Sequence, residues 1–580
     1  MRTVEPEDVA VGIMETLANP RPRVYVPRMA GRLAGVAQGL RGACPALMIT
    51  DLWTRATGEA LSFKTLIDAG LVRADPPWVL ARAGGAIARY GAVGAAVSIA
   101  AARYPDRVGV RDERGDLTYA ELEQRSNALA NHWREIGLRP GGGVALLARN
   151  HRGFLDAFYA AAKCGARMVL LNTDFAGPQA REVCAREGVD LLVHDEEYTA
   201  MTAEVPAPLG RFLAWTDSPT PGSLEALIAS GDSTAPPRVS QHAKIVILTS
   251  GTTGTPKGAL REEPKSLLPF GGLFGKVPFR SAEVMEGCAP MFHALGLTTV
   301  MLGVSLGHTV VLRRRFDPVA TLDSIERNRV TTVVAVPAML GRIVEAAADH
   351  PVDTSSLRIV FLAGSQLGAD LCLRATALLG PVLYNLYGST EVAYATIGTP
   401  DELAIEPGSV GSPCPGVVVR ILDDDGREVP WGVTGRIFVR NVMPFSGYTG
   451  GGGKEVVDGL MSTGDVGHLD PNGFLHIDGR DDDMIVSGGE NLFPGEVEEL
   501  IATHPDVVEA SCIGVDDEKF GKRLHAFVVR RGDGLGEDDV KDFVKDNLAR
   551  FKVPRGVTFL DELPRNPTGK VLKRELEKLT

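Results

Sequence analysis

The sequence lacks paired cysteines, a positive net charge and any long unbroken apolar run, and each absence narrows the possible functions. No CxxC pair occurs, and the seven cysteines stand singly, at positions 44, 164, 184, 288, 372, 414 and 512. Such scattered cysteines favour buried thiols in a reducing cytoplasm. The net charge of −12 argues against a nucleic-acid partner, because its phosphates would be repelled by the protein's overall field.

Long apolar segments are equally scarce. The sequence contains no signal peptide and no run of about 18 apolar residues, the length that a membrane span requires. The closest approach, residues 84–102, is interrupted by Arg89. We therefore expect a cytoplasmic protein.

The length of the chain predicts several domains. It has 580 residues, of which 44% are hydrophobic, whereas single cores stop growing at roughly 250 to 300 residues. We expect an N-terminal extension over residues 1–100, a large domain over residues 101–480 and a small C-terminal domain over residues 481–580.

The N-terminal extension is rich in alanine, glycine, arginine and proline. Residues 16–50 contain five arginines and no acidic residue. This locally basic, partly apolar arm could lie on an anionic membrane surface, which would suit a lipidic substrate. The alternative is an arm packed on its own domain or on the neighbouring subunit of a homodimer.

The following segment shows alternating strand and helix patterns. Thr118 and Glu121 form a capping box, which predicts a helix that ends near Gly137. Short apolar runs predict buried strands at 144–147, 168–171, 188–194, 212–215, 245–248, 309–312, 331–336 and 359–363. The alternation predicts a large α/β domain with layers of parallel sheet. Ligands of such sheets bind beyond the carboxyl ends of the strands.

From about Gly411 the pattern changes to short strands separated by Gly and Asp turns, which predicts a β-rich subdomain. After residue 480 a small α+β domain is expected. Its helices are predicted at 494–503 and 537–550 and its strands at 508–515 and 524–530, with a helical tail at 571–579.

The most informative stretch is Thr249–Gly258, which follows the predicted strand at 245–248. It holds three glycines, five hydroxyl side chains and Lys257, so that backbone N–H groups, hydroxyls and a cation can converge on a phosphate. It is not a GxxxxGK[ST] loop, because Thr255 and Pro256 stand between Gly254 and the lysine. The alternative is a Gly/Ser/Thr linker without a ligand.

This stretch and four others resemble the motifs of the adenylate-forming superfamily, which comprises acyl-CoA synthetases, peptide-synthetase adenylation domains and luciferases. The four are Tyr387–Glu391, Ser462–Asp465, Gly479–Asp482 and Pro567–Lys570, in the family's order and rough spacing. The resemblance implies a small mobile C-terminal domain that turns on a hinge at Asp482.

The resemblance also implies how these residues bind ATP. Tyr387 would pack on the adenine, Thr390 would contact the α-phosphate, and Asp465, on a surface loop, would hold the ribose hydroxyls with Arg480 nearby. Glu391 and Thr249 would be the oxygen ligands of Mg²⁺. The ATP-binding residues implied in full are Thr249, Ser250, Gly251, Thr252, Thr253, Gly254, Lys257, Gly364, Ser365, Gln366, Tyr387, Gly388, Ser389, Thr390, Asp465, Arg480 and Lys570.

The expected chemistry is the activation of a carboxylic acid. ATP converts the carboxylate into an acyl-adenylate, and the site must stabilise negative charge between the carboxylate and the α-phosphate. Lys570, His293 and Thr390 are the expected catalytic residues. His293 resembles the histidine beside the reacting carboxylate, and the alternative is a buried histidine that is hydrogen-bonded within the fold.

The same resemblance implies which acid is activated and which molecule accepts the acyl group. Ser487, Gly488 and Gly489 look most like the CoA channel of medium- and long-chain fatty acyl-CoA synthetases, so we expect a fatty acid:CoA ligase. One alternative is an enzyme that loads a carrier protein or activates an aryl or other acid. Another is a non-catalytic nucleotide-binding scaffold.

Overall fold

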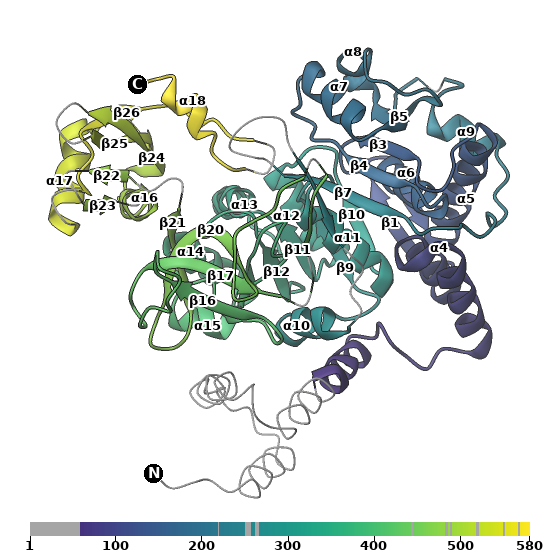
Figure 1. Cartoon of the computed structure of the whole chain (residues 1–580), viewed down its shortest axis with the longest axis horizontal. Helices are drawn as coiled ribbons and strands as arrows, with labels where there is room; N and C mark the ends of the chain where they lie inside the picture. Colours follow the sequence, from purple (N-terminus) through teal and green to yellow (C-terminus); the bar gives the residue numbers. More distant parts are fainter. Residues whose placement is uncertain are drawn as a thin grey trace, which may run out of the picture. The chain divides into compact units, whose positions relative to one another are not determined.

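The computed structural model describes residues 58–580. The exceptions are residues 219, 250–256, 262–265, 442, 444, 450, 482–484, 488–489, 493, 518–520, 549–551 and 567–568. Residues Gly58–Thr580 form one compact unit (Figure 1).

Two sheets with parallel centres form the large part of this unit. The seven-stranded sheet has the order β18-β8-β7-β4-β3-β5-β6, in which β7, β4, β3, β5 and β6 are parallel. Its strands are β3 (Gly143–Leu147), β4 (Arg167–Leu170), β5 (Val189–Asp195), β6 (Gly210–Trp215), β7 (Lys244–Thr249), β8 (Lys257–Arg261) and β18 (Phe445–Tyr448).

The nine-stranded sheet has the order β15-β14-β13-β12-β11-β9-β10-β1-β2 and is parallel from β13 to β1. Its strands are β1 (Val108–Asp112), β2 (Gly115–Thr118), β9 (Val284–Gly287), β10 (Thr309–Leu312), β11 (Thr332–Ala335), β12 (Ile359–Leu362), β13 (Leu383–Tyr387), β14 (Thr396–Gly398) and β15 (Ser412–Pro413).

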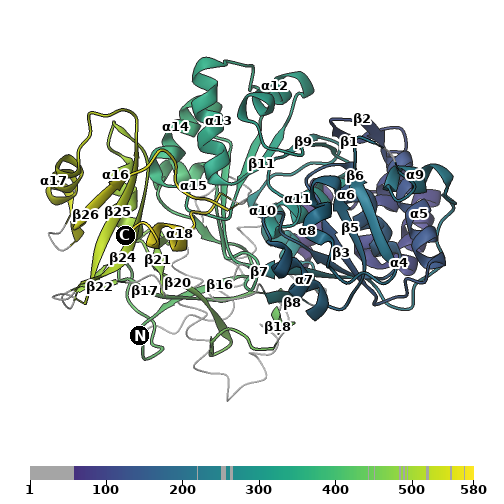
Figure 2. The ribbon, with the colours of Figure 1, turned by 90° about the horizontal axis from the view of Figure 1, so that it is seen from above.

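Helices cover both faces of these sheets. The helices α5 (Tyr119–Glu135), α6 (Arg152–Lys163), α11 (Ala294–Leu306) and part of α4 (Pro77–Arg103) share one core with strands of both sheets. The helices α12 (Pro318–Asn328), α13 (Pro337–Asp349) and α14 (Ala369–Leu379) lie side by side on the nine-stranded sheet (Figure 2). The others are α7 (Gly177–Arg186), η1 (Glu196–Tyr198), α8 (Thr199–Thr202), α9 (Leu224–Ser230), α10 (Leu268–Lys276) and α15 (Pro400–Ile405).

A third, five-stranded antiparallel sheet packs its apolar side chains against the nine-stranded sheet. Its strands are β16 (Val418–Leu422), β17 (Gly435–Arg440), β19 (Val456–Val457), β20 (Leu460–Leu469) and β21 (Leu475–Arg480). It is the β-rich subdomain that the Gly and Asp turns predict.

The C-terminal part has its own sheet and core. Its elements are β22 (Ile485–Ser487), β23 (Glu490–Leu492), α16 (Pro494–Ala502), β24 (Val507–Asp517), β25 (Gly521–Arg530), α17 (Glu537–Asn547), β26 (Gly556–Phe559) and α18 (Lys573–Glu577). The predicted α/β class, with a β-rich subdomain and a small α+β domain, is therefore confirmed.

The helix α4 is long and apolar enough to cross a membrane by length and composition alone. It is not straight, because Gly91 adopts φ 72° and ψ −179° and divides it into two arms, residues 77–90 and 92–103. Tyr90 and Ala86 pack with Ala95 and Ile99. These contacts, together with the ion pair between Arg103 and Asp75, show that the first arm folds back along the second.

Most sequence-predicted elements are present, with different ends. The capping box of Thr118 and Glu121 starts α5 as predicted. The predicted helix at 537–550 ends at Asn547 and the predicted tail helix is limited to Lys573–Glu577. No local pattern indicated that the parallel strands are divided between two sheets.

Candidate active site

A hairpin brings together the two ends of the phosphate-loop stretch. Thr249, the last residue of β7, pairs with Lys257, the first residue of β8. The intervening Ser250, Gly251, Thr252, Thr253 and Gly254 lie outside the described residues, as do the side chains of Thr249 and Lys257. The backbone thus fixes where the loop leaves and re-enters the sheet.

Glu391 is held by two hydroxyl groups. Ser389 Oγ donates to its Oε2 at 2.9 Å, and Tyr448 Oη donates to its Oε1 at 2.6 Å. Ser389 Oγ also accepts from the backbone N–H of Glu391 at 3.2 Å, which shapes the turn after β13. Tyr448 belongs to β18, which pairs with β8. The carboxylate predicted to bind Mg²⁺ is therefore tied to the phosphate-loop hairpin by a tyrosine that the sequence motifs did not indicate.

Asp465 lies at the centre of a second cluster. Tyr387 Oη donates to its Oδ2 at 2.6 Å, and Arg480 Nη1 donates to its Oδ1 at 3.0 Å. Burial, and next the Asp465 carboxylate, raise the pKa of Tyr387 well above its usual value. The three residues come from three predicted motifs, and the fold brings their side chains together.

The predicted surface loop around Asp465 is wrong. Asp465 lies inside β20, directly opposite Arg480 of β21, and its side chain is only 13% exposed. The preceding Gly464 has φ 80°, and a Cβ there would lie 3.3 Å from Nζ of Lys454. Lys454 thus places a second cation beside this cluster, and no sequence motif indicated it.

The segment after β12 reaches the C-terminal part. Gly364 has φ 100°, a conformation that favours glycine, and Ser365 beside it is exposed. Gln366 Nε2 donates to Oε1 of Glu499, a residue of α16, at 2.6 Å. A residue predicted to line the adenine side therefore also joins the large part of the chain to the C-terminal part.

The segment that carries Lys570 forms a tight turn. The backbone N–H of Asn566 donates to the carbonyl of Lys570 at 2.9 Å, and the backbone N–H of Lys570 donates to Asn566 Oδ1 at 2.9 Å. Gly569 has φ 76°, and a Cβ there would lie 3.0 Å from Cβ of Ala338. The turn therefore packs against the start of α13, beyond the carboxyl end of β11. Lys570 itself is exposed.

His293 precedes α11 and its ring packs against Phe292, with 4.4 Å between ring centroids. Its Nε2 is buried, and no hydrogen-bond partner for this atom is found among the described residues. Burial lowers the pKa of His293 to about 4. Buried polar atoms are normally hydrogen-bonded, so a buried Nε2 without a partner among the described residues favours a histidine that binds a ligand. The alternative, a histidine hydrogen-bonded within the fold, fits this atom less well.

Comparison with known proteins tests whether the chain belongs to the superfamily that its motifs resemble. The AMP-binding enzyme family matches residues 97–449, and the AMP-binding enzyme C-terminal domain matches residues 496–570. This chain belongs to the AMP-binding enzyme family.

Gly488, Gly489 and Asp482 lie outside the described residues, so the CoA channel and hinge stay predictions, as do the domain boundaries at 100 and 480.

Three relatives of this AMP-binding enzyme carry names that differ in the acid. It is 34% identical to the indoleacetate–CoA ligase of Aromatoleum aromaticum, with 82% of this chain and 95% of the relative covered. It is 35% identical to the feruloyl-CoA synthase of an Amycolatopsis species (82% and 96% covered). It is 31% identical to the fatty acid–[acyl-carrier-protein] ligase ScoC of Streptomyces coeruleorubidus (81% and 93% covered).

Solved structures show the same fold with nucleotides bound. ATP-bound MatB from Rhodopseudomonas palustris is 29% identical, with a TM-score of 0.72 over 82% of this chain and 95% of that one. The o-succinylbenzoate CoA synthetase MenE from Bacillus subtilis, in complex with its acyl-adenylate, is 27% identical, with a TM-score of 0.73 over 83% and 97%. The AMP-binding enzyme is therefore an AMP-forming acid:CoA ligase that uses ATP and CoA.

The residues around Glu391 fit Mg²⁺. The described residues contain no cluster of three or more His, Cys, Asp or Glu side chains that could enclose a metal ion. Mg²⁺ usually binds through one or two carboxylates together with substrate phosphates, so Glu391 beside the phosphate-loop hairpin is a suitable ligand. The ion would neutralise phosphate charge, and Ser389 and Tyr448 would hold the carboxylate in place.

Removing the Tyr448 hydroxyl is expected to weaken the use of Mg²⁺. Tyr448→Phe deletes one of two donors to Glu391, and outer partners of metal ligands typically contribute about 10- to 100-fold in metal affinity. Calorimetric titration of ATP binding at graded Mg²⁺ concentrations should show that the variant binds Mg²⁺ with about tenfold lower affinity than the wild type. Tyr159→Phe is the matched control, because no partner of its buried hydroxyl is found among the described residues. Equal Mg²⁺ dependence in both variants would contradict the assignment.

His293 is expected to remain neutral at pH 5. Because its pKa in the folded state lies below that of the unfolded chain, about 6.5, its stabilising contribution is complete above pH 6.5 and falls as the pH drops toward 4. His293→Gln should therefore lose less stability than wild type between pH 7 and pH 5, by about 1 to 2 kcal/mol. Chemical denaturation at both pH values measures this difference. An imidazole resonance of His293 that titrates near pH 6.5 would contradict it.

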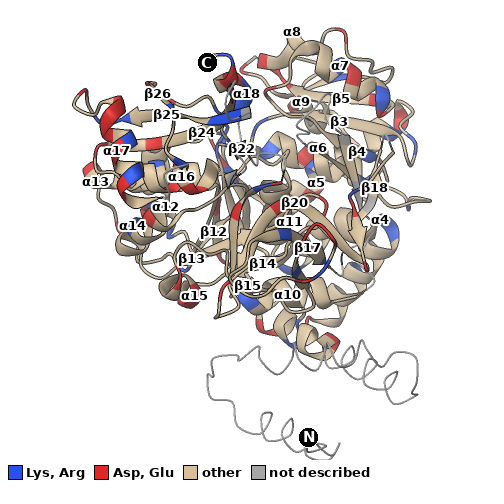
Figure 3. Cartoon of the chain, turned by 60° about the vertical axis from the view of Figure 1, so that its left-hand side comes forward, with Lys and Arg blue, Asp and Glu red and all other residues tan. Residues whose placement is uncertain are grey.

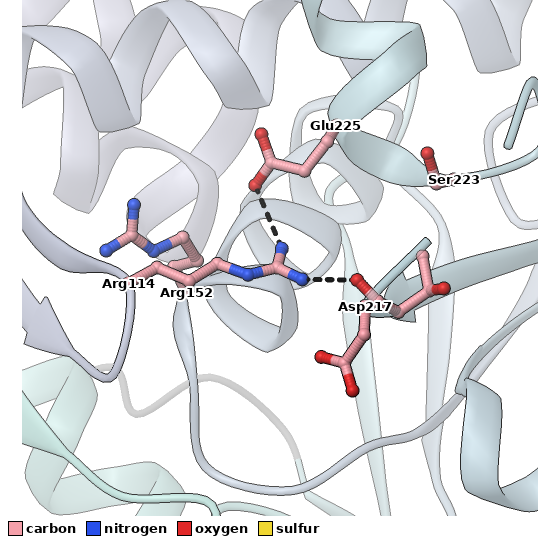
Figure 4. Close-up of a pocket in the computed structure, with 6 residues that line it drawn as sticks. Arg114, Arg152, Asp217, Ser223 and Glu225 are labelled. Carbon is pink, nitrogen blue, oxygen red and sulfur yellow. Dashed lines mark hydrogen bonds and ion pairs between the residues drawn. The ribbon is translucent and has the colours of Figure 1, made fainter. Parts of the chain in front are cut away.

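A pocket of about 410 Å³ lies apart from these residues (Figure 4). Arg114 donates to the carbonyl of Thr216 and approaches Glu225 at 3.6 Å. Arg152 forms an ion pair with the buried Asp112 at 2.5 Å. Both cations are thus already paired, and none of the predicted site residues lines the pocket.

Proposed function

We propose that this acid:CoA ligase activates an acid with an apolar body, a medium- or long-chain fatty acid. The observation that supports this choice is that the residues adjoining three predicted site segments in the sequence are apolar and buried. Phe292, Val336 and Ala363 are 4%, 3% and 7% exposed, and they adjoin His293, the first residue of α13 and Gly364. An acid with a second charge would be poorly solvated beside such residues.

The proposed reaction has two steps in one site. A carboxylate oxygen of the acid attacks the α-phosphorus of ATP, and pyrophosphate leaves. The CoA sulfur then attacks the acyl carbon, its proton is released, and AMP leaves. Asp465 and Arg480 would hold the ribose, Lys570 and Thr390 would face the α-phosphate, and His293 would hydrogen-bond the carboxylate.

The second candidate is an aryl acid. The indoleacetate and feruloyl relatives share slightly more identity with this chain than the fatty acid relative does. Their acids also have apolar bodies, so the same apolar residues suit them. The name of ScoC raises a further alternative, an acyl-carrier-protein acceptor in place of CoA.

A pyrophosphate-release assay over two series of acids separates these candidates. Straight-chain acids of graded length, indoleacetate and ferulate are compared at equal concentration with ATP, Mg²⁺ and CoA. Turnover that peaks with a chain of about eight or more carbons supports the fatty acid proposal. A peak with an aryl acid would replace it by the second candidate, and equal AMP release with acyl carrier protein would identify the other acceptor. Lack of turnover with every acid would favour a nucleotide-binding scaffold.

A further inference from the structure

The first arm of α4, residues 77–90, has an outer surface that is almost entirely apolar. Val79, Ala86 and Tyr90, spaced by seven and four residues, are buried toward the body of the enzyme. Trp78 and Leu80 point away from that face and are 65% and 52% exposed. A helix that is apolar on both sides is normally covered on both sides.

The exposed residues form two edges with a flat crest between them. Leu80 and Ile87, seven residues apart, share one edge, and Ile87 is 47% exposed. Trp78, Arg82 and Arg89, spaced by four and seven, share the other edge. The crest between the edges carries small residues, namely Ala81, Gly84, Gly85 and Ala88, all exposed. The long side chains of both edges can therefore contact one flat partner surface that lies over the crest.

The charge of this arm has one sign. Residues 77–90 contain no acidic residue and none of Lys, Ser, Thr, Asn and Gln, and Arg82 and Arg89 are the only charges. Charges of both signs are mixed along other surface helices, such as α7 and α17 (Figure 3). The arm is thus a basic, apolar surface on a protein whose net charge is −12.

The preceding helical residues, 58–68, also expose large apolar side chains, although their charges are of both signs. Leu61, Phe63 and Ile67 are 60%, 46% and 47% exposed. Six of the seventeen large exposed hydrophobic side chains among the described residues therefore fall between positions 61 and 87. On the arm itself, Trp78, Leu80 and Ile87 lie on one exposed helix surface, and an exposed apolar surface of this kind is typical of an interaction site.

We propose that the first arm of α4 docks flat on the surface of an anionic lipid bilayer, with Trp78, Leu80 and Ile87 among the acyl chains and Arg82 and Arg89 at the phosphates. The arm is fourteen residues long, about 21 Å, and the turn at Gly91 prevents its continuation across a hydrocarbon core of about 30 Å. It therefore lies in the interface and does not span it.

Charge favours the bilayer over two other occupants. A second copy packed face to face and antiparallel would bring Arg82 and Arg89 of each subunit together without a compensating acid, and a parallel copy would bury these arginines against the apolar edge of Leu80 and Ile87. Residues 16–50 carry only arginines as charged residues, so this stretch is also repelled by the arm. Anionic headgroups, by contrast, attract each arginine.

Vesicle sedimentation of the full-length enzyme tests the proposal. Vesicles of phosphatidylglycerol and phosphatidylcholine in equal parts are compared with vesicles of phosphatidylcholine alone. The wild type should sediment with the anionic vesicles, and added salt should reduce its binding. Trp78→Glu and Ile87→Glu should each lower the partition coefficient by about tenfold or more, and Arg82→Gln by about fivefold.

Matched variants serve as controls. Trp431→Glu alters a tryptophan that is 50% exposed, and Arg427→Gln alters an arginine whose side chain is 74% exposed, both in the β-rich subdomain. Both should bind vesicles like the wild type, and all variants should keep the melting temperature. Absence of wild-type binding to either vesicle would overturn the proposal. Equal losses of vesicle binding in the controls would also overturn it. So would unchanged vesicle binding in Trp78→Glu and Ile87→Glu, including the case in which these variants lose only contact with a second copy of the chain.

Discussion

Replacing Lys570 with alanine is expected to slow acyl-adenylate formation by about two to three orders of magnitude, the usual cost of removing one preorganised electrostatic contact. The turn formed by Asn566 and Gly569 packs at the start of α13 and presents Lys570 beyond the end of β11. There an ammonium can stabilise negative charge that develops between the carboxylate and the α-phosphate. Because this charge appears only in the transition state, loss of the lysine should lower the rate of adenylation more than it lowers the affinity for the substrates.

The same variant should still convert supplied acyl-adenylate and CoA to thioester at close to the wild-type rate, because that step no longer involves the triphosphate. Lys578→Ala is the matched control: it lies just after α18, its side chain is 67% exposed, and its ion pair among the described residues is with the nearby Glu575. Single-turnover measurements of both half-reactions decide the role. Comparable losses in the two half-reactions would make Lys570 structural, and no loss in either would remove it from the mechanism.

Asp465→Ala is expected to reduce ATP affinity or turnover by about ten- to a hundredfold, since charge-assisted hydrogen bonds to two ribose hydroxyls are each worth roughly 1.5 to 3 kcal/mol. The free enzyme already holds both carboxylate oxygens, through Tyr387 and Arg480. Asp465 is therefore oriented before ATP binds. The variant should also lower stability, because it leaves a half-buried tyrosine hydroxyl without its acceptor.

The enzyme contains a close control for this substitution. Asp116 and Arg111 form a second Asp–Arg pair directly across two antiparallel strands, β2 and β1, far along the nine-stranded sheet. Asp116→Ala removes the same type of ion pair and should leave ATP kinetics unchanged. Isothermal titration with ATP and a thermal melt on both variants separate binding from folding. An unaltered ATP affinity in Asp465→Ala would contradict the ribose assignment.

Local patterns predicted much of the fold correctly because local physics determines them. The capping box at Thr118 satisfies backbone donors within one turn, so the start of α5 is readable from four residues. The apolar runs that became β3 and β4 are buried on both faces, as parallel strands require. Pairing between distant strands left no such local signal, so the division into two sheets could not be predicted.

The site was predictable where its residues follow one another in a motif, and not where they meet across the fold. Tyr387, Glu391, Asp465 and Arg480 were each indicated by neighbours in sequence. Tyr448 contacts Glu391 from 57 positions away through the pairing of β18 with β8, and an isolated tyrosine carries no signal of that kind. The only local hint was its position in the glycine-rich stretch before residue 453.

The turn in α4 could not be predicted either. Composition marked residues 84–102 only as the longest apolar stretch, interrupted by Arg89. The structure breaks it at Gly91, where glycine tolerates φ 72° and where a Cβ would lie 2.7 Å from the ring of His242. That close approach depends on a residue about 150 positions further along the chain, so no window around Gly91 could reveal it.

The most direct test of the central claim is acid-dependent exchange of labelled pyrophosphate into ATP, measured on the wild-type enzyme first without and then with CoA. An AMP-forming acid:CoA ligase should catalyse exchange with its acid in the absence of CoA, because adenylation is reversible. On addition of CoA it should release AMP and acyl-CoA in equal amounts. Hydrolysis of ATP to ADP, or absence of acid-dependent exchange across fatty and aryl acids, would contradict the account.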